Sequence, residues 1–75
     1  MNVTLYTRKG CHLCDVAIEL LVAHGLEPHL IDIDTDESLR SAFDTCVPVV
    51  EIDGKVRFRG RIEPILLKRL LMGSS

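Results

Sequence analysis

The fold is decided by the stretch Asn2-Val3-Thr4-Leu5-Tyr6-Thr7-Arg8-Lys9-Gly10-Cys11-His12-Leu13-Cys14, in which an alternating segment runs through a short loop into a Cys-x-x-Cys motif. Polar and apolar residues alternate over 2–6, which predicts a β-strand. From Cys11 onward apolar residues recur at helical spacing, and Gly25 stands where a left-handed cap would end a helix. The residues expected on the inward face of this helix are Leu13, Val16, Ala17, Leu20, Leu21 and His24.

Three further elements are predicted downstream. Residues 27–34 have the pattern of a second strand, and 35–43 of a short helix whose start carries the capping-box pair Asp34 and Glu37. Residues 62–72 form the last predicted helix, with proline in its first turn and cations near its end. The residues expected to face inward are Leu39, Ala42 and Phe43 on the middle helix, and Ile65, Leu66 and Leu70 on the last.

A hairpin is expected over residues 47–58, around Asp53-Gly54. A two-residue turn would put Ile52 and Lys55 on the same face, whereas a three-residue loop would group Val50 with Val56 and Phe58. We therefore expect the three-residue loop, with Gly54 in the left-handed conformation.

The order strand, helix, strand, helix, strand, strand, helix predicts an α/β domain over residues 1–75. Its mixed four-stranded sheet (βαβαββα) should have a parallel first pair of strands, an antiparallel last pair and three helices. A reactive group is expected where the first strand hands over to the first helix, which is the position of Cys11.

Composition narrows the function. The 75 residues carry nine Lys and Arg against eleven Asp and Glu, a net charge of −2, so the chain lacks the positive field that attracts nucleic acid or an anionic membrane. Apolar runs are short and the N-terminus lacks a signal-peptide pattern. We expect a cytoplasmic monomer that binds neither nucleic acid nor membrane.

The two cysteines of the motif have unequal environments. Unpaired amide groups and the helix dipole stabilise a thiolate at a helix N-terminus, so Cys11 should ionise more readily than an ordinary cysteine. Arg8, Lys9 and protonated His12 would act in the same direction. Cys14 lies one turn deeper on the same face. We therefore expect Cys11 to attack a disulfide and Cys14 to resolve the resulting mixed disulfide.

The run from Tyr6 to Cys14, followed by Val47-Pro48 and a glycine-turn hairpin, resembles the glutaredoxins of the thioredoxin superfamily. The Gly-Cys-His-Leu-Cys-Asp segment is most similar to short bacterial glutaredoxin-like proteins. The resemblance implies a thioredoxin fold, a cis peptide at Val47-Pro48 and a thiol–disulfide oxidoreductase. It also implies, as partner, a disulfide-containing protein or a glutathionylated substrate. The reductant would be glutathione or a protein of the thioredoxin-reductase type, and no tightly bound cofactor is expected.

The resemblance also implies substrate-binding positions. Arg8, three positions before the first cysteine, would meet a carboxylate of glutathione, and Val47 would offer its backbone beside Pro48. Gly60 and Arg61 are candidates for a second carboxylate. Two departures stand out, since His12-Leu13 replaces the usual Pro-Tyr and Arg59-Gly60-Arg61-Ile62 replaces the familiar Gly-Gly-Cys-Asp.

Other interpretations remain open. The same cysteines, with Cys46 or His12, could hold a metal ion or an iron–sulfur cluster, or the domain could be a non-catalytic adaptor. Cys46 is either a third thiol of the site or a small buried apolar residue. The basic row Lys55, Arg57, Arg59 and Arg61 either protects a sheet edge from pairing or forms a docking patch for an acidic partner or for glutathione carboxylates.

Overall fold

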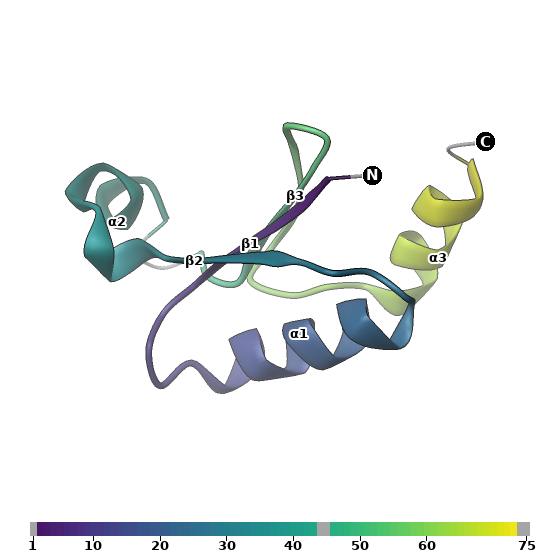
Figure 1. Ribbon diagram of the computed structural model, residues 1–75, viewed down its shortest axis with the longest axis horizontal. Helices are drawn as coiled ribbons and strands as arrows, with labels where there is room; N and C mark the ends of the chain where they lie inside the picture. Colours follow the sequence, from purple (N-terminus) through teal and green to yellow (C-terminus); the bar gives the residue numbers. More distant parts are fainter. Residues whose placement is uncertain (1, 44–45, 74–75) are drawn as a thin grey trace.

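Residues 2–43 and 46–73 are described by the computed structural model, and within them four strands and three α-helices follow in the predicted order (Figure 1). The elements are β1 (Val3–Thr7), α1 (His12–Ala23), β2 (His29–Asp32), the 3₁₀ turn η1 (Ile33–Thr35), α2 (Glu37–Phe43), β3 (Val49–Ile52), β4 (Lys55–Arg59) and α3 (Pro64–Gly73).

The sheet has the strand order β2-β1-β3-β4, with β1 parallel to β2 and the other pairs antiparallel. The predicted mixed sheet and α/β thioredoxin fold are therefore confirmed, and β2 and β4 are its edges. Because Tyr6 pairs with Val49, the start of β3 lies at the carboxyl end of β1, the same edge at which the chain turns into α1.

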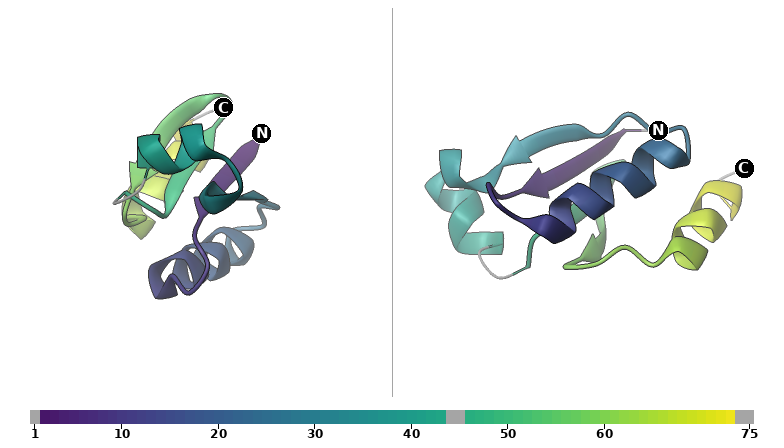
Figure 2. Two further views of the ribbon diagram at one scale, coloured as in Figure 1. Left: turned by 90° about the vertical axis from the view of Figure 1, so that its left-hand side faces the viewer. Right: turned by 90° about the horizontal axis from the view of Figure 1, so that it is seen from below.

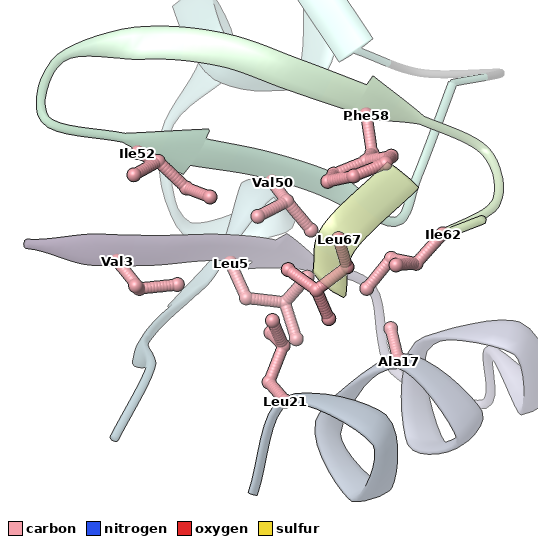
Figure 3. Packing of buried hydrophobic residues seen from close by; sticks show 9 residues of the cluster. All are labelled: Val3, Leu5, Ala17, Leu21, Val50, Ile52, Phe58, Ile62 and Leu67. Atoms are coloured by element: carbon pink, nitrogen blue, oxygen red, sulfur yellow. The ribbon is translucent and has the colours of Figure 1, made fainter. Parts of the chain in front are cut away.

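One face of the sheet packs against α1 and α3 (Figure 3). Ala17, Leu21 and Leu67 are at most 3% exposed and contact the strands' inward side chains. On the opposite face, α2 covers the carboxyl end of β1, where the rings of Phe43 and Tyr6 lie 4.9 Å apart. The inward side chains of the strands and of the segment before α3 are Val3, Leu5, Val50, Ile52, Phe58 and Ile62.

Helix registers differ from the sequence expectation. On α1, Leu13 and Val16 are 53% and 45% exposed, because the neighbouring stripe of Cys14, Ala17 and Leu21 faces the sheet instead. On α3 the inward positions are Leu67, Leu70 and Leu71, a spacing of three and four residues, whereas Ile65 and Leu66 are exposed. On α2, Leu39 and Phe43 are half-buried but Ala42 is exposed, and Asp36 rather than Asp34 caps the helix by accepting from the Ser38 amide.

The hairpin has a two-residue turn, so the expected three-residue loop is wrong. Asp53 and Gly54 both have positive φ, 52° and 83°, the combination that matches the twist of a two-residue hairpin. Ile52 therefore faces Lys55, and parity is restored by a β-bulge that leaves Arg57 as the extra residue of β4. The bulge brings Phe58 opposite Val50 in the core, but Val56 pairs with Glu51 and is exposed.

This turn gives a first prediction. Asp53→Val should lower the free energy of unfolding by roughly 1–2 kcal/mol, because a β-branched residue is strained at positive φ. The substitution also removes the carboxylate that accepts from the Asn2 amide at 2.9 Å. Urea denaturation measures the loss, and Asp53→Asn, which tolerates the same backbone conformation, is the matched control. Equal stabilities of the two variants would contradict this account of the turn.

Candidate functional site

Cys11 occupies the N-cap position of α1, with extended backbone angles of φ −84° and ψ 106°. Its Sγ accepts a hydrogen bond from the backbone amide of Cys14 at 3.2 Å. Its own amide donates to the Arg8 carbonyl at 3.1 Å, which closes the loop between β1 and α1. The side chain is half-buried, so the sulfur of a substrate can reach Cys11 Sγ from the solvent. This Sγ already accepts a hydrogen bond from an amide at the start of the helix.

Cys14 has a different environment, as expected from its depth. It is only 2% exposed, and burial raises the pKa of its thiol to about 12. A hydrogen bond with the Cys11 side chain contributes to this increase, while a backbone hydrogen bond at Arg8 acts in the opposite direction. At neutral pH Cys14 is therefore a protonated thiol, and all three cysteines are unpaired. The geometry leaves Cys11 as the accessible sulfur of the pair.

The raised pKa of Cys14 predicts a pH dependence of stability. Folding favours its neutral thiol, so the contribution is complete below the unfolded value of about 9 and is lost as the pH rises toward about 12. Under reducing conditions, the free energy of unfolding should fall more steeply between pH 9 and 11 in the wild type than in Cys14→Ser. Tyr6 also has a raised pKa, caused first by its hydrogen bond to Glu51, but both proteins keep it. Parallel pH profiles in urea denaturation would refute the assignment.

The Val47-Pro48 segment lies at the same sheet edge as Cys11. Its peptide bond is cis, as the resemblance implied, and Pro48 is buried while Val47 is half-buried. The Gly60 amide donates to the Pro48 carbonyl at 2.8 Å, and Gly60 adopts a φ of 75°. The segment around Gly60 is thus tied to Pro48, at the sheet edge where β1 leads into the Cys11 loop.

The charged candidates are arranged less simply. The Arg8 guanidinium pairs with Asp34 at 3.2 Å, while Lys9 and His12 are exposed. The Arg61 side chain is also exposed and lies 3.9 Å from Glu63. Sequence reasoning missed a pocket of about 560 Å³, in which Arg8 meets one face of α2; its lining residues are Arg8, Glu37, Arg40 and Ser41. The only sequence signal for it is the spacing of Glu37 and Arg40, which puts both on one face.

The part of the chain that the structure describes contains no group of three or more His, Cys, Asp or Glu side chains placed to hold a metal ion. Nor do residues 2–43 and 46–73 include a helix with the length and apolar character of a membrane span.

A four-stranded mixed sheet with a Cys-x-x-Cys pair at the start of α1 and a cis proline before β3 defines a thioredoxin-fold protein with a dithiol site. The glutaredoxin-like domain family (DUF836) matches residues 2–72. The chain therefore belongs to this family of the thioredoxin superfamily.

Solved structures share this fold. The X-ray structure of the structural-genomics target protein XcR50 from X. campestris is 32% identical, covering 97% of this chain and 99% of that one, with a TM-score of 0.82. Its solution structure is 33% identical, covering 100% and 97%, with a TM-score of 0.81. The glutaredoxin-like protein NrdH-redoxin from Escherichia coli is 27% identical, covering 93% and 95%, with a TM-score of 0.70. A search of curated proteins finds no match.

Proposed function

We propose that this protein is a thiol–disulfide oxidoreductase that reduces protein disulfides or glutathione mixed disulfides. The observation that carries the proposal is the asymmetry of the pair: Cys11 is half-buried at a helix N-cap, whereas Cys14 is buried and its pKa is about 12. A reducing dithiol needs one sulfur that attacks the target disulfide and a second that later resolves the mixed disulfide.

The reaction proceeds in two exchanges. The Cys11 thiolate attacks one sulfur of the target disulfide, forming a mixed disulfide and releasing the other target sulfur as a thiolate that takes up a proton. The Cys14 thiol then loses its proton and its sulfur attacks Cys11 Sγ. The Cys11–Cys14 disulfide forms, the second target sulfur leaves as a thiol, and the target has gained two electrons and two protons.

The Cys14 amide contributes to the first step, because it donates to the Cys11 sulfur while that sulfur carries charge. Burial holds Cys14 protonated until the mixed disulfide forms. The oxidised pair is reduced again by glutathione or by a protein of the thioredoxin-reductase type. Such a cycle suits the cytoplasm, where thiols are kept reduced.

Two features favour different reductants. Arg8 and Arg40 line one pocket, where a guanidinium could receive a carboxylate of glutathione. Against this, Arg8 already pairs with Asp34, and Glu37 adds a negative charge to the same pocket. NrdH-redoxin, a relative of the same fold, is described by its thioredoxin-like activity profile, which supports a protein reductant here.

The test is to offer a glutathionylated peptide and a peptide disulfide separately to the wild type and to Cys14→Ser. A protein reductant and a dithiol cycle predict that Cys14→Ser loses turnover of both substrates and accumulates the Cys11 mixed disulfide, visible by mass spectrometry. Turnover of the glutathionylated peptide by Cys14→Ser would instead identify glutathione as the reductant. If the wild type reduces neither substrate with either reductant, the proposed function is wrong.

A further inference from the structure

An apolar groove of about 510 Å³ runs beside the first turns of α1 and is not used by the exchange described above. In Figure 2, right, the segment that leads from β4 to α3 runs alongside α1. Residues of this segment line the groove opposite the helix. The side chains that matter to its chemistry are Leu13, Val16 and Leu20 on α1, and Arg61, Ile62 and Pro64 opposite. We call this surface the α1 groove.

The α1 groove is continuous with the dithiol site. Leu13 lies between the two cysteines, and Gly60, which lines the other wall, is hydrogen-bonded to Pro48. Leu13 and Val16 lie three residues apart on one face of the helix, and they are 53% and 45% exposed. A target whose sulfur is attacked at Cys11 thus has neighbouring residues within reach of exposed apolar surface.

The charges beside the α1 groove indicate which charge a bound partner should carry. Residues 55–61 contain four exposed cations, Lys55, Arg57, Arg59 and Arg61, and no acidic residue. The remainder of the chain has five cations against eleven acidic residues, a net charge of −6. The cations follow edge strand β4 toward the groove. The last of them, Arg61, lines the groove and lies 3.9 Å from the carboxylate of Glu63. A row of cations beside an apolar groove complements a partner that has apolar and acidic groups side by side.

We infer that the α1 groove selects target proteins that present a large apolar side chain next to an acidic residue close to the reactive disulfide. The apolar side chain fills the space between Val16 and Ile62, and the acidic residue faces Arg61. This inference rests on the proposed function and specifies its substrate class. Glutathione has no large apolar group, so the groove offers it little, and protein targets are favoured over glutathione mixed disulfides.

The experiment compares two peptides that carry the same disulfide, one with Leu-Asp beside the cysteine and one with Ser-Ser. Each is also made with serine in place of cysteine, so that its affinity can be measured by fluorescence polarisation without any exchange. The proteins are the wild type, Val16→Gln in the groove, and Val22→Gln, an equally apolar and 57% exposed position of α1 outside it. Arg61→Gln is paired with Lys55→Gln at the far end of β4.

The Leu-Asp peptide should have a kcat/KM and an affinity roughly tenfold or more above those of the Ser-Ser peptide, the effect of burying about one large aliphatic side chain. Val16→Gln should remove this advantage while Val22→Gln keeps it, and Arg61→Gln should weaken Leu-Asp binding more than Lys55→Gln. Reduction of bis(2-hydroxyethyl) disulfide, which has neither group, should be unchanged in Val16→Gln.

Other outcomes overturn the inference. It is wrong if the two peptides bind alike, or if both valine variants have the same effect. It is also wrong if sedimentation shows a dimer that Val16→Gln dissociates, because a second copy then covers the groove. If the protein reduces the hydroxyethyl disulfide but does not discriminate between the peptides, the inferred role of the groove is wrong and the proposed function stands. A protein that reduces no disulfide refutes the function, and the non-reacting peptides still decide the groove.

Discussion

Cys11→Ser should lower the rate of disulfide reduction by on the order of a thousandfold or more, because the exchange loses its attacking sulfur. Cys14 cannot take over. Its side chain is only 2% exposed, and with a pKa of about 12 it is protonated at neutral pH. The rate is measured with a peptide disulfide under excess reductant, and trapping of mixed disulfides by mass spectrometry checks the intermediate.

Cys46→Ser is the matched control, since Cys46 is also half-buried but lies outside the helix start, in the turn before Val47. We expect this variant to keep the wild-type rate. A Cys11→Ser protein that still reduces the peptide, or a Cys46→Ser protein that does not, would move the reactive centre to Cys46. Either result would contradict the roles given to the Cys11–Cys14 pair.

Leu67→Ala should lower the free energy of unfolding by about 2–5 kcal/mol, the usual cost of emptying a fully buried leucine position. Leu67, on α3, is 0% exposed and belongs to the hydrophobic core. For a chain of 75 residues, a loss of this size is a large part of the total stability. Urea or thermal denaturation, followed by circular dichroism, measures it.

The neighbouring leucine provides the control. Leu66 is 51% exposed, so Leu66→Ala should change the free energy of unfolding by only about 0.5 kcal/mol or less. The pair of variants decides the register of α3, because the sequence pattern placed Leu66 inward. A larger loss from Leu66→Ala than from Leu67→Ala would show that α3 packs in the register expected from sequence, with Leu66 facing the core.

The dithiol site could be predicted largely from local sequence. A strand that ends in a short loop before Cys11 places that residue at a helix N-terminus whatever the rest of the chain does, and Cys14 follows one turn later. Both positions were found as expected. The cis bond at Val47-Pro48 came from the resemblance to glutaredoxins and was confirmed. The pocket between Arg8 and Arg40 was missed, because it depends on how α2 sits against the loop after β1.

The hairpin shows why pairing is harder to predict than periodicity. The three-residue loop was expected because it brings Phe58 opposite Val50 by placing one extra residue in the turn, whereas a regular two-residue turn does not. The chain inserts it at Arg57 within edge strand β4 and keeps the tight turn. Edge strands tolerate bulges because only one side of the strand is hydrogen-bonded within the sheet, and no local signal marks the position.

By itself, the sequence determined the order of elements, the mixed sheet and the place of the reactive cysteines, because alternation, helical spacing and cap residues act over a few neighbouring positions. Only the tertiary structure decided which stripe of α1 and α3 is buried and which remains as the α1 groove. Both helices have apolar residues on more than one stripe, and burial of one stripe depends on the angle at which the helix meets the sheet. That angle is a property of the packed molecule and leaves no mark in any single segment.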